Sequence, residues 1–363
     1  MEMIERIRVE NFGPIKQIDI QIRDINVFIG TTSSGKSTVA KLIAIFQNKD
    51  ILFRANWEKN RELPTNTLIE FRRLLVAYNI DYNIAKDTLI RYELDGLYCE
   101  ISHGAVISST FSPYSSIIYT NPVYMPAERV FYSTLSESIF SLITNDVAIP
   151  RWLAEFGSRF EKARREISTL DLSFLGASYG FENGEDVISL TNGDSIKLSQ
   201  ASSGIQSIVP LMVVLQAMTE FPNDIEKETS YDLFIVEEPE MNLFPSSQKL
   251  LLEFIIQRIK RCSDKVIITT HSPYILTSLD NLVQAENAAE LSNKTEEVDA
   301  LVPQELWVDF EKVSCYFFDA GHCRETLDKE LRSLAPSDID GVSQELGKVY
   351  EALLQLSYVK NEL

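Results

Sequence analysis

The chain is poor in cysteine and histidine. Its 363 residues contain 4 cysteines and 3 histidines, and no pair of cysteines has the C-x-x-C spacing. A disulfide framework or a clustered-thiol zinc site is therefore not expected. Cys315, His322 and Cys323 lie close together in sequence, but their spacing is not that of a zinc site either. Widely separated cysteines fit reduced thiols in the cytoplasm.

Long apolar runs, internal repeats and low-complexity tracts are also missing. The longest apolar stretches, Ile208–Met218 and Leu233–Val236, fall short of the roughly 20 residues that cross a bilayer. The first residues include Glu2 and Glu5 and lead into an alternating, strand-like pattern rather than the apolar core of a signal peptide. We therefore expect a cytoplasmic protein without membrane contacts.

Positive charge is scarce, with 34 Lys and Arg against 53 Asp and Glu, a net charge of −19. Such a field repels nucleic acid and anionic membranes unless a local basic patch is present. The densest basic cluster lies on the polar side of a predicted amphipathic helix that begins after Pro150. Its members are Arg159, Lys162, Arg164 and Arg165. The cluster is either a solvated helix face or a contact for nucleic acid or an acidic partner.

One eight-residue motif has specific chemistry. Residues 30–37 follow the pattern G-x-x-x-x-G-K-[ST], after the strand-like run Ile25–Ile29 and before a predicted helix. Its glycines let backbone N–H groups surround a phosphate, and the helix N-terminus favours an anion. In this motif Lys36 would reach the β- and γ-phosphates, and the Ser37 hydroxyl would bind Mg²⁺. The predicted triphosphate-binding residues are Gly30, Thr31, Thr32, Ser33, Ser34, Gly35, Lys36, Ser37 and Thr38.

Acidic residues end a second apolar run, Leu233–Val236, which is followed directly by Glu237 and Glu238. A buried strand places such carboxylates at its exposed carboxyl edge. Glu237 would then orient the Mg²⁺ shell, and Glu238 would polarise the attacking water as general base. His271 follows the next predicted strand, where its imidazole can reach a γ-phosphate or hold the water and the glutamate in register.

Strands and helices alternate after residue 208, which predicts a mostly parallel sheet with ligands at the carboxyl ends of its strands. A small-residue turn at 198–207 opens an apolar helix and offers another anion-binding helix N-terminus. Other expected elements are strands Ile7–Phe12, Ile15–Ile22, Ser115–Tyr119 and Lys265–Thr270, helices Thr67–Ala77 and Ile84–Leu89, strand-like pieces in Ile90–Ile101, and a hairpin at 187–198. A helix at Val342–Leu356 would pack on the core or serve a partner interface.

The order of these motifs resembles the ATP-binding-cassette (ABC) ATPase superfamily, specifically its OLD/RecF/SMC-like branch of soluble ATPases. The matching segments are Val9–Ile15, Gly30–Ser37, Ala201–Gln206 as a variant signature, Val236–Glu240, Met241–Pro245 as the D-loop, and Thr270–Pro273. The resemblance implies an α/β fold, an ABC ATPase head with a P-loop, a mostly parallel central sheet and an antiparallel β subdomain. Residues 1–50 and 195–363 would form this head, and residues 51–194 an inserted α-helical and α+β lobe. That lobe would include a Q-loop-like segment at 124–129 and the first strand of hairpin 187–198.

Roles for residues follow from the resemblance. Lys36, Glu238 and His271 would be catalytic, and Ser37 and Glu237 would hold Mg²⁺, partly through water. The signature residues Ser202, Ser203 and Gly204 would contact the ATP of a second subunit, with the register open by one residue. In the segment 124–129, Glu128 or Arg129 is either a metal or phosphate contact or part of a salt-bridged loop.

The resemblance also implies a biological role. ATP and Mg²⁺ would drive head-to-tail association into a homodimer or higher oligomer. No TOPRIM-type E…DxD acid constellation is recognisable after His271. We therefore expect the ATPase component of a bacterial antiphage defence system, similar to Septu or PARIS, which controls a separate effector protein. A DNA-binding repair or recombination ATPase of RecF/SMC type is the alternative, and an ABC transporter motor subunit ranks lower.

Overall fold

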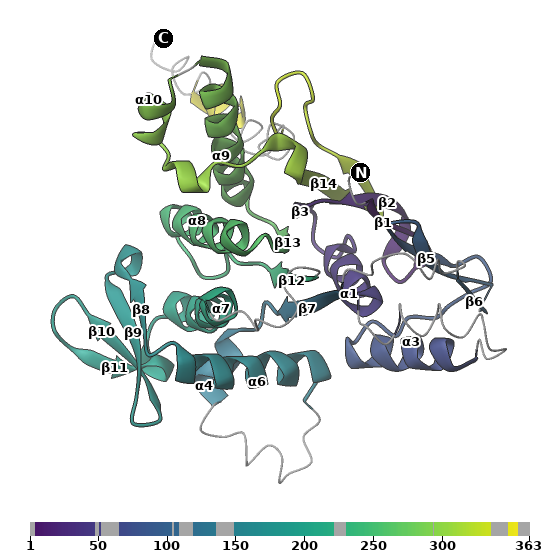
Figure 1. The fold of residues 1–363 in the computed structure, drawn as a ribbon, viewed down its shortest axis with the longest axis horizontal. Coiled ribbons are helices and arrows are strands. Elements are labelled where there is room, and N and C mark those ends of the chain that lie inside the picture. Colours follow the sequence, from purple (N-terminus) through teal and green to yellow (C-terminus); the bar gives the residue numbers. More distant parts are fainter. Residues whose placement is uncertain are drawn as a thin grey trace, which may run out of the picture.

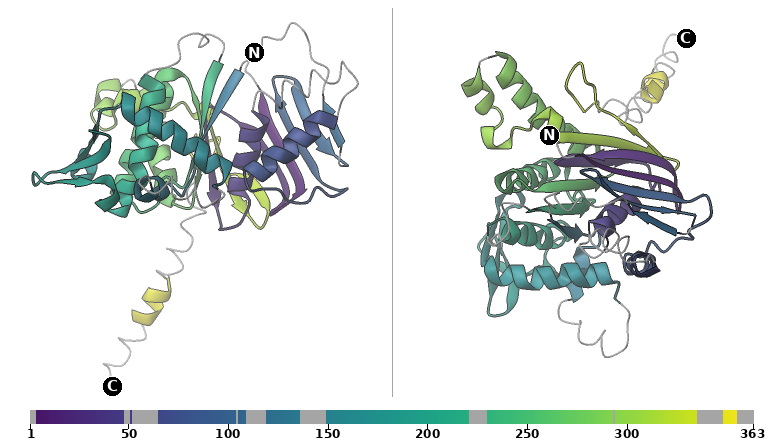
Figure 2. Two further views of the ribbon diagram at one scale, coloured as in Figure 1. Left: turned by 90° about the horizontal axis from the view of Figure 1, so that it is seen from below. Right: turned by 45° about the vertical axis from the view of Figure 1, so that its right-hand side comes forward.

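A computed structural model describes residues 4–47, 51, 65–103, 105–108, 119–135, 149–220, 230–292, 294–334 and 348–354. Two β-sheets organise these residues. One has eleven strands in the order β6-β5-β4-β1-β2-β15-β14-β3-β13-β12-β7, and the other has four in the order β11-β10-β9-β8. The four-stranded sheet lies at the opposite side of the molecule from β4–β6 (Figures 1 and 2).

The strands of the large sheet are β1 (Glu5–Phe12), β2 (Ile15–Ile22), β3 (Ile25–Gly30), β4 (Leu89–Leu94), β5 (Leu97–Ser102), β6 (Ala105–Ser108), β7 (Tyr119–Met125), β12 (Ser230–Glu237), β13 (Lys265–Thr270), β14 (Val313–Asp319) and β15 (His322–Glu325). Those of the small sheet are β8 (Thr169–Leu172), β9 (Ala177–Glu182), β10 (Glu185–Leu190) and β11 (Ser195–Lys197). The helices are α1 (Lys36–Phe46), α3 (Thr65–Ala77), α4 (Val130–Leu135), α6 (Arg151–Glu166), α7 (Ser203–Glu220), α8 (Pro245–Cys262), α9 (Pro273–Ser292) and α10 (Thr295–Asp299).

The large sheet has a parallel and an antiparallel part. Strands β14, β3, β13, β12 and β7 pair in parallel. Strands β6, β5, β4, β1 and β2 pair antiparallel. The predicted α/β class, with a parallel centre and an antiparallel β part, is confirmed, and both parts belong to one continuous sheet.

Helices cover both faces of the parallel strands (Figure 1). Helix α1 contacts β3, β7, β12 and β13 and lies on the face that also holds α3. Helices α6, α7, α8 and α9 contact each other in that order and form a row on the other face. Every residue of β13 is buried, as expected for a strand covered on both faces.

Two buried polar side chains join distant strands. Asn26 on β3 donates from Nδ2 to the Val266 carbonyl on β13, and its Oδ1 accepts the Ser314 hydroxyl on β14. Glu5 on β1 is fully buried and accepts Lys265 Nζ of β13 at 2.9 Å. The Glu5 carboxylate also accepts Tyr92, Tyr231 and Gln47 side chains. These hydrogen bonds connect the antiparallel part to the parallel part.

Most predicted elements lie where the sequence placed them, but the predicted helix Ile84–Leu89 is wrong. Residues 81–88 contain no helix, and β4 begins at Leu89. The segment makes turn contacts instead: the Ala85 N–H donates to Thr88 Oγ1, and the Thr88 hydroxyl donates to the Asn11 carbonyl of β1. So short a segment cannot hold a helix by itself against such tertiary contacts.

Two other predicted elements fall partly outside the described residues. Of the predicted strand Ser115–Tyr119, only Tyr119 is described, as the first residue of β7. Of the predicted helix Val342–Leu356, residues 348–354 are described and are helical. Val349 and Leu353 are 57% and 60% exposed, so this described part does not pack on the core.

The proposed division into a head and an inserted lobe stays a prediction. Strands β4–β7 fall within residues 51–194, yet they pair with β1 and β12 of the large sheet. Helices α4 and α6 and strands β8–β10 of the small sheet form the part of this segment that lies beside α7, whereas β11 of the same sheet lies beyond residue 194 (Figure 1).

Candidate functional site

The phosphate loop connects β3 to α1 and is shaped by two glycines. Gly30 has φ 148° and Gly35 has φ 104°, values that side-chain-bearing residues rarely adopt. A Cβ on Gly30 would lie 2.0 Å from the carbonyl oxygen of Phe318 on β14. The Thr31 N–H donates to the same oxygen at 3.1 Å. The start of the loop therefore lies directly against β14, where only glycine fits.

Lys36 is the first residue of α1 and lies beneath the loop. Its Nζ donates to the carbonyl oxygens of Gly30 at 3.0 Å and Thr31 at 2.7 Å. Burial lowers the pKa of Lys36 from 10.5 to about 8, although the carboxylates of Glu238 and Glu240 act in the opposite direction. The loop thus holds a buried ammonium group that an anionic ligand would stabilise.

The predicted acids and histidine meet at the same sheet edge as the phosphate loop. Because β3, β13 and β12 are parallel neighbours, residues that follow these strands share one edge. Glu238 follows β12 and His271 follows β13, and Glu238 Oε1 lies 3.6 Å from His271 Nε2. Both side chains are about one third exposed, so water reaches them.

Glu238 has an unusual backbone and an unusual acidity. Its φ is 42°, a left-handed conformation that costs a non-glycine residue free energy. Burial raises the pKa of its carboxyl group, the nearby Glu240 and Glu237 raise it further, and His271 and Lys36 oppose the shift. A carboxylate with a raised pKa is a better proton acceptor than an ordinary surface glutamate.

Glu240 positions the segment that carries His271. Its Oε1 accepts hydrogen bonds from the Thr270 hydroxyl and from the His271 N–H, both at 2.7 Å. The following residue, Ser272, donates its hydroxyl to Gln248 Oε1 on α8 at 2.6 Å. The turn after β13 is therefore fixed to the turn after β12 and to α8.

Glu237 is the residue whose surroundings fit a cation. It is 5% exposed, and its Oε1 has no hydrogen-bond partner among the described residues. A buried carboxylate oxygen without a partner costs free energy unless a cation or donor reaches it. Burial, and then the charge of Glu237, raise the pKa of the nearby Tyr124 phenol, but this hydroxyl also has no hydrogen-bond partner among the described residues and so does not satisfy the carboxylate oxygen. Ser37 lies in the first turn of α1, at the sheet edge that Glu237 also reaches, and its hydroxyl and a carboxylate are oxygen ligands of the kind that Mg²⁺ prefers.

The predicted signature residues open α7. Ser202 precedes the helix and accepts the Gln206 N–H on its carbonyl at 2.9 Å, and Ser203 is the first helical residue. A Cβ on Gly204 would lie 2.9 Å from the Asn242 carbonyl in the predicted D-loop. The turn that opens α7 therefore contacts the D-loop segment of its own chain. The phosphate loop contacts a different element, β14.

Arg129 has a different role from the phosphate contact considered on sequence grounds. Its side chain is fully buried, and its guanidinium donates to backbone carbonyl oxygens of Pro126, Glu237, Glu238 and Ser207. Burial lowers the pKa of Arg129 to about 10. The salt-bridged-loop alternative is closer, but here the acceptors are carbonyl groups rather than carboxylates.

Asp319 is a site residue that the sequence reasoning did not assign. It ends β14, and its Oδ1 accepts the Thr31 hydroxyl of the phosphate loop at 3.1 Å. The available signal was an apolar run, residues 313–318, that ends in an acid. Pairing between β14 and β3, which brings Asp319 to the loop, is not readable from local sequence.

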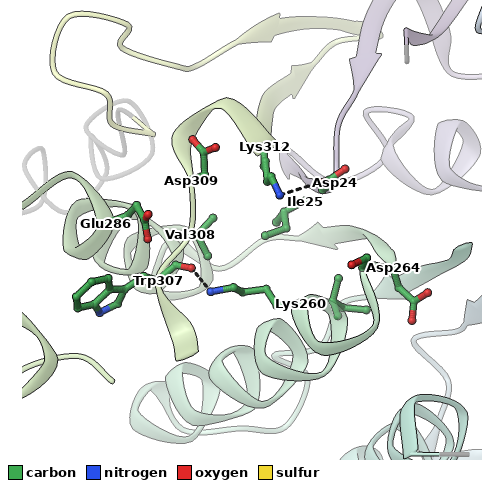
Figure 3. A pocket seen from close by; sticks show the side chains of 11 residues that line it. Asp24, Ile25, Lys260, Asp264, Glu286, Trp307, Val308, Asp309 and Lys312 are labelled. Carbon is green, nitrogen blue, oxygen red and sulfur yellow. Dashed lines mark hydrogen bonds and ion pairs between the residues drawn. The ribbon is translucent and has the colours of Figure 1, made fainter. Parts of the chain in front are cut away.

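A separate cavity of about 360 Å³ lies at the opposite, amino-terminal edge of the parallel strands (Figure 3). Its charged side chains largely have partners. Lys260 donates to the Trp307 carbonyl, and Lys312 Nζ lies 3.8 Å from Asp24 Oδ2. The candidate nucleotide-binding residues are at the other end of the sheet, so this cavity is distinct from their site.

Comparison with protein families finds one match. Residues 3–112 and 144–276 match the family described as the AAA ATPase domain. The matched stretches include the phosphate loop, Glu237, Glu238 and His271, and the turn that opens α7. No curated protein matches this chain. Among the described residues, no helix is both long enough and apolar enough to cross a membrane.

Several solved structures share distant similarity. An ATP-binding cassette of an ABC transporter in its ADP conformation is 14% identical, with 96% of this chain and 100% of that chain covered and a TM-score of 0.39. An SMC head domain from Thermotoga maritima is 13% identical, with 76% and 91% covered and a TM-score of 0.37. A part of an ABC transporter complex from Clostridium perfringens is 13% identical, with 99% of each chain covered and a TM-score of 0.37.

Proposed function

Because this chain belongs to the AAA ATPase domain family, we propose that it hydrolyses ATP with Mg²⁺ and that bound ATP joins two copies head to tail. We further propose that it is the ATPase component of a bacterial antiphage defence system that controls a separate effector. The observation that carries the ATPase assignment is the shared sheet edge. There the buried Lys36 lies under a glycine-shaped loop, and the Glu238–His271 pair follows the adjacent strands.

Each residue would contribute one part of the hydrolytic step. The loop N–H groups and the Lys36 ammonium would bind the β- and γ-phosphates. Glu238, with its raised pKa, would accept a proton from the attacking water, and His271 would keep that water and Glu238 in register. Ser37 and Glu237 would hold Mg²⁺, which when bound neutralises phosphate charge.

One surface feature supports association of a second copy. In the head-to-tail arrangement that we propose, the Ser202–Gly204 turn of one subunit would meet the ATP bound at Lys36 of the other. Phe244, the residue before α8, and Tyr274, in the first turn of α9, are 77% and 52% exposed. Ser272 and Gln248 join these helix starts, so the exposed aromatic rings flank one part of the surface. Apolar surface of this kind favours a protein contact.

Paired variants test this proposal. Lys36→Ala should abolish ATP binding and ATP-driven dimerisation together, because the loop loses its cation. Glu238→Gln should bind ATP and accumulate the dimer, because hydrolysis no longer releases it. ATP turnover, binding of a fluorescent ATP analogue and sedimentation velocity with and without ATP measure the three properties. Lys249→Ala removes an exposed lysine that pairs with Glu253 on α8 and should behave like the wild type.

Three results would separate the parts of the proposal. Wild-type protein without ATP turnover would refute the ATPase assignment. Turnover with a monomer in every nucleotide state would leave the ATPase and refute the head-to-tail switch. DNA cleavage by the purified chain alone with Mg²⁺ or Mn²⁺ would refute a separate effector, because the chain itself would then be a nuclease.

The defence role needs a cellular test. Co-expression with the protein encoded by the neighbouring gene should reduce phage plating, and Lys36→Ala in this chain should restore it. If the two wild-type proteins leave phage plating unchanged, and if the neighbouring gene encodes a permease, a role in transport would be favoured instead.

DNA binding is the second candidate, and the surface of α6 favours it. Arg164 pairs with Asp186 at 2.8 Å, but Lys162 and Arg165 are exposed on the same helix and Arg159 is half-buried. Replacing Lys162 and Arg165 with Glu should abolish a mobility shift of duplex DNA if α6 contacts phosphates. If this helix face is only solvated and has no function, neither the wild type nor the double variant should shift the DNA.

A further inference from the structure

We propose that Arg129 is a positioning residue for the ATPase reaction: its guanidinium fixes the backbone that carries Glu238 and ties it to the first turns of α7. This inference rests on the proposed function. Arg129 lies between the two stretches of the chain that match the family, in the segment that follows β7. It does not contact the phosphate loop through any of its hydrogen bonds in the described residues.

The guanidinium joins three segments of the chain. Its Nη1 donates to the carbonyl oxygens of Glu237 and Pro126, both at 2.6 Å. Its Nη2 donates to the Glu238 carbonyl at 2.9 Å, and its Nε donates to the Ser207 carbonyl of α7 at 3.1 Å. A planar fork with several donors in fixed directions can hold these acceptors at once, which a lysine cannot.

The hydrogen bond to Glu238 matters because of its backbone conformation. The Glu238 N–H donates to the Thr269 carbonyl of β13 at 2.8 Å, and the Glu238 carbonyl accepts Arg129 at 2.9 Å and, at the longer distance of 3.2 Å, the Met241 N–H of the following turn. Between these contacts its φ is 42°. Surrounding contacts must impose such a conformation on a glutamate. Without Arg129, we expect the residue to relax and its carboxylate to leave its place beside His271.

The hydrogen bond between α4 and α7, next to the Arg129 contact, has a cause that can be read in the helix. Pro210 lies inside α7 and has no N–H, so the Gln206 carbonyl four residues earlier loses its helical donor. The Ser133 hydroxyl of α4 donates to this carbonyl at 2.9 Å instead. The next carbonyl, that of Ser207, accepts Arg129. The segment from Pro126 to α4 thus binds α7 where the proline interrupts its hydrogen bonds.

These contacts have a joint consequence. The same guanidinium holds the proposed general base and the helix that begins with the Ser202–Gly204 turn. A movement of α7 when that turn meets a second subunit would therefore be transmitted to Glu238 through Arg129. Arg129 is fully buried and donates to backbone carbonyl oxygens, so it acts on the reaction through Glu238.

Arg129→Lys and Arg129→Gln test the inference, and Arg164→Lys is the matched control. Arg164 is also a largely buried arginine of the same region, but it pairs with Asp186, and no hydrogen bond or ion pair joins it to β12 among the described residues. Because a misplacement of about 1 Å can cost on the order of 100-fold in rate, we expect both Arg129 variants to lose about 10- to 100-fold in kcat. Their KM for ATP and their affinity for a fluorescent ATP analogue should stay within about threefold, because Lys36 and its loop remain.

Amide hydrogen exchange without nucleotide gives a readout independent of turnover. In both Arg129 variants, peptides that cover 236–240 and 203–208 should exchange faster, while hairpin β10–β11 should exchange as in the wild type. In Arg164→Lys the hairpin β10–β11 should exchange faster, because Asp186 belongs to β10, while the peptides that cover 236–240 and 203–208 should exchange as in the wild type.

Three outcomes would overturn the inference. An unchanged kcat in folded Arg129→Lys and Arg129→Gln would show that Glu238 does not need Arg129. A loss of ATP affinity equal to the loss of kcat would make Arg129 a binding residue. Failure of both variants to fold, while Arg164→Lys folds, would assign Arg129 to the fold alone. Wild-type turnover that Glu238→Gln abolishes would confirm the ATPase function in each case, so the two failures are distinguishable.

Discussion

The lowered pKa of Lys36 predicts that ATP binding weakens above neutral pH. Burial brings the pKa of this lysine from 10.5 to about 8 in the nucleotide-free protein. Only the ammonium form can pair with phosphate oxygens, so a proton must be supplied for binding when Lys36 is neutral. The folded protein carries the charged form below pH 8 and loses it as the pH rises through 8. Affinity should follow the same course.

The size of the effect follows from the pKa. If only the charged form binds, the apparent Kd is proportional to 1 + 10^(pH − 8), which rises about tenfold from pH 7 to pH 9. A lysine with the ordinary pKa of 10.5 would change Kd by less than about 5% over this range. Phosphate groups titrate near pH ~6, below this window, and contribute little.

Isothermal titration calorimetry of Mg²⁺-ATP at constant ionic strength, at pH 7, 8 and 9, measures the effect in the non-hydrolysing Glu238→Gln background. The Glu238 carboxylate raises the pKa of Lys36, so this background should shift the midpoint to lower pH. Lys36→Arg is the control, because a guanidinium stays charged throughout the range and its Kd should not depend on pH. A wild-type-loop Kd that is constant within twofold, or an equal pH dependence in Lys36→Arg, would refute the reasoning.

Two further predictions concern buried contacts elsewhere. Lys265→Met removes the cation that lies 2.9 Å from the fully buried Glu5 carboxylate. Because a buried charge is then left without its partner, the free energy of unfolding measured by urea denaturation should fall by about 3–5 kcal/mol. A loss below about 1 kcal/mol would mean that the remaining donors to Glu5 suffice. Gly204→Ala places a Cβ 2.9 Å from the Asn242 carbonyl, so α7 and the D-loop segment must move apart. Sedimentation velocity should then show several-fold weaker ATP-driven dimerisation, although alanine favours a helix by about 1 kcal/mol over glycine. Dimerisation at the wild-type level would show that the close contact between Gly204 and Asn242 is not needed.

The elements that sequence predicts well are those whose cause is local. The bounds of β13 are the predicted ones because an uninterrupted β-branched and apolar run describes a strand buried on both faces. Hairpin β10–β11 was equally readable, since Gly193 adopts the positive φ that its turn requires. The helix predicted at Ile84–Leu89 is wrong because the apolar spacing there matches a short helix, whereas a contact with Asn11 of β1 decides the structure of this segment.

The candidate site divides in the same way. Lys36, Glu238 and His271 were found because each stands next to a strand whose pattern is visible in the sequence. The contact of Asp319 and the hydrogen bonds of Arg129 depend on which strands become neighbours and on how α7 packs beside them. Those facts come from pairings across the whole chain, for which a single sequence has no local signal.

The position of β3 between β13 and β14 has a consequence for synthesis on the ribosome. Asn26 of β3 bonds to partners 240 and 288 positions later in the chain, and the Phe318 carbonyl of β14 accepts the Thr31 N–H of the phosphate loop. Contacts between such distant segments form late in folding. A nascent chain therefore contains its complete phosphate-loop sequence long before β14, the strand that the loop contacts, has been synthesised. We therefore expect nucleotide to stabilise the growing chain only after β14 has emerged, and the apolar residues of β3 to stay without their partner strand until then.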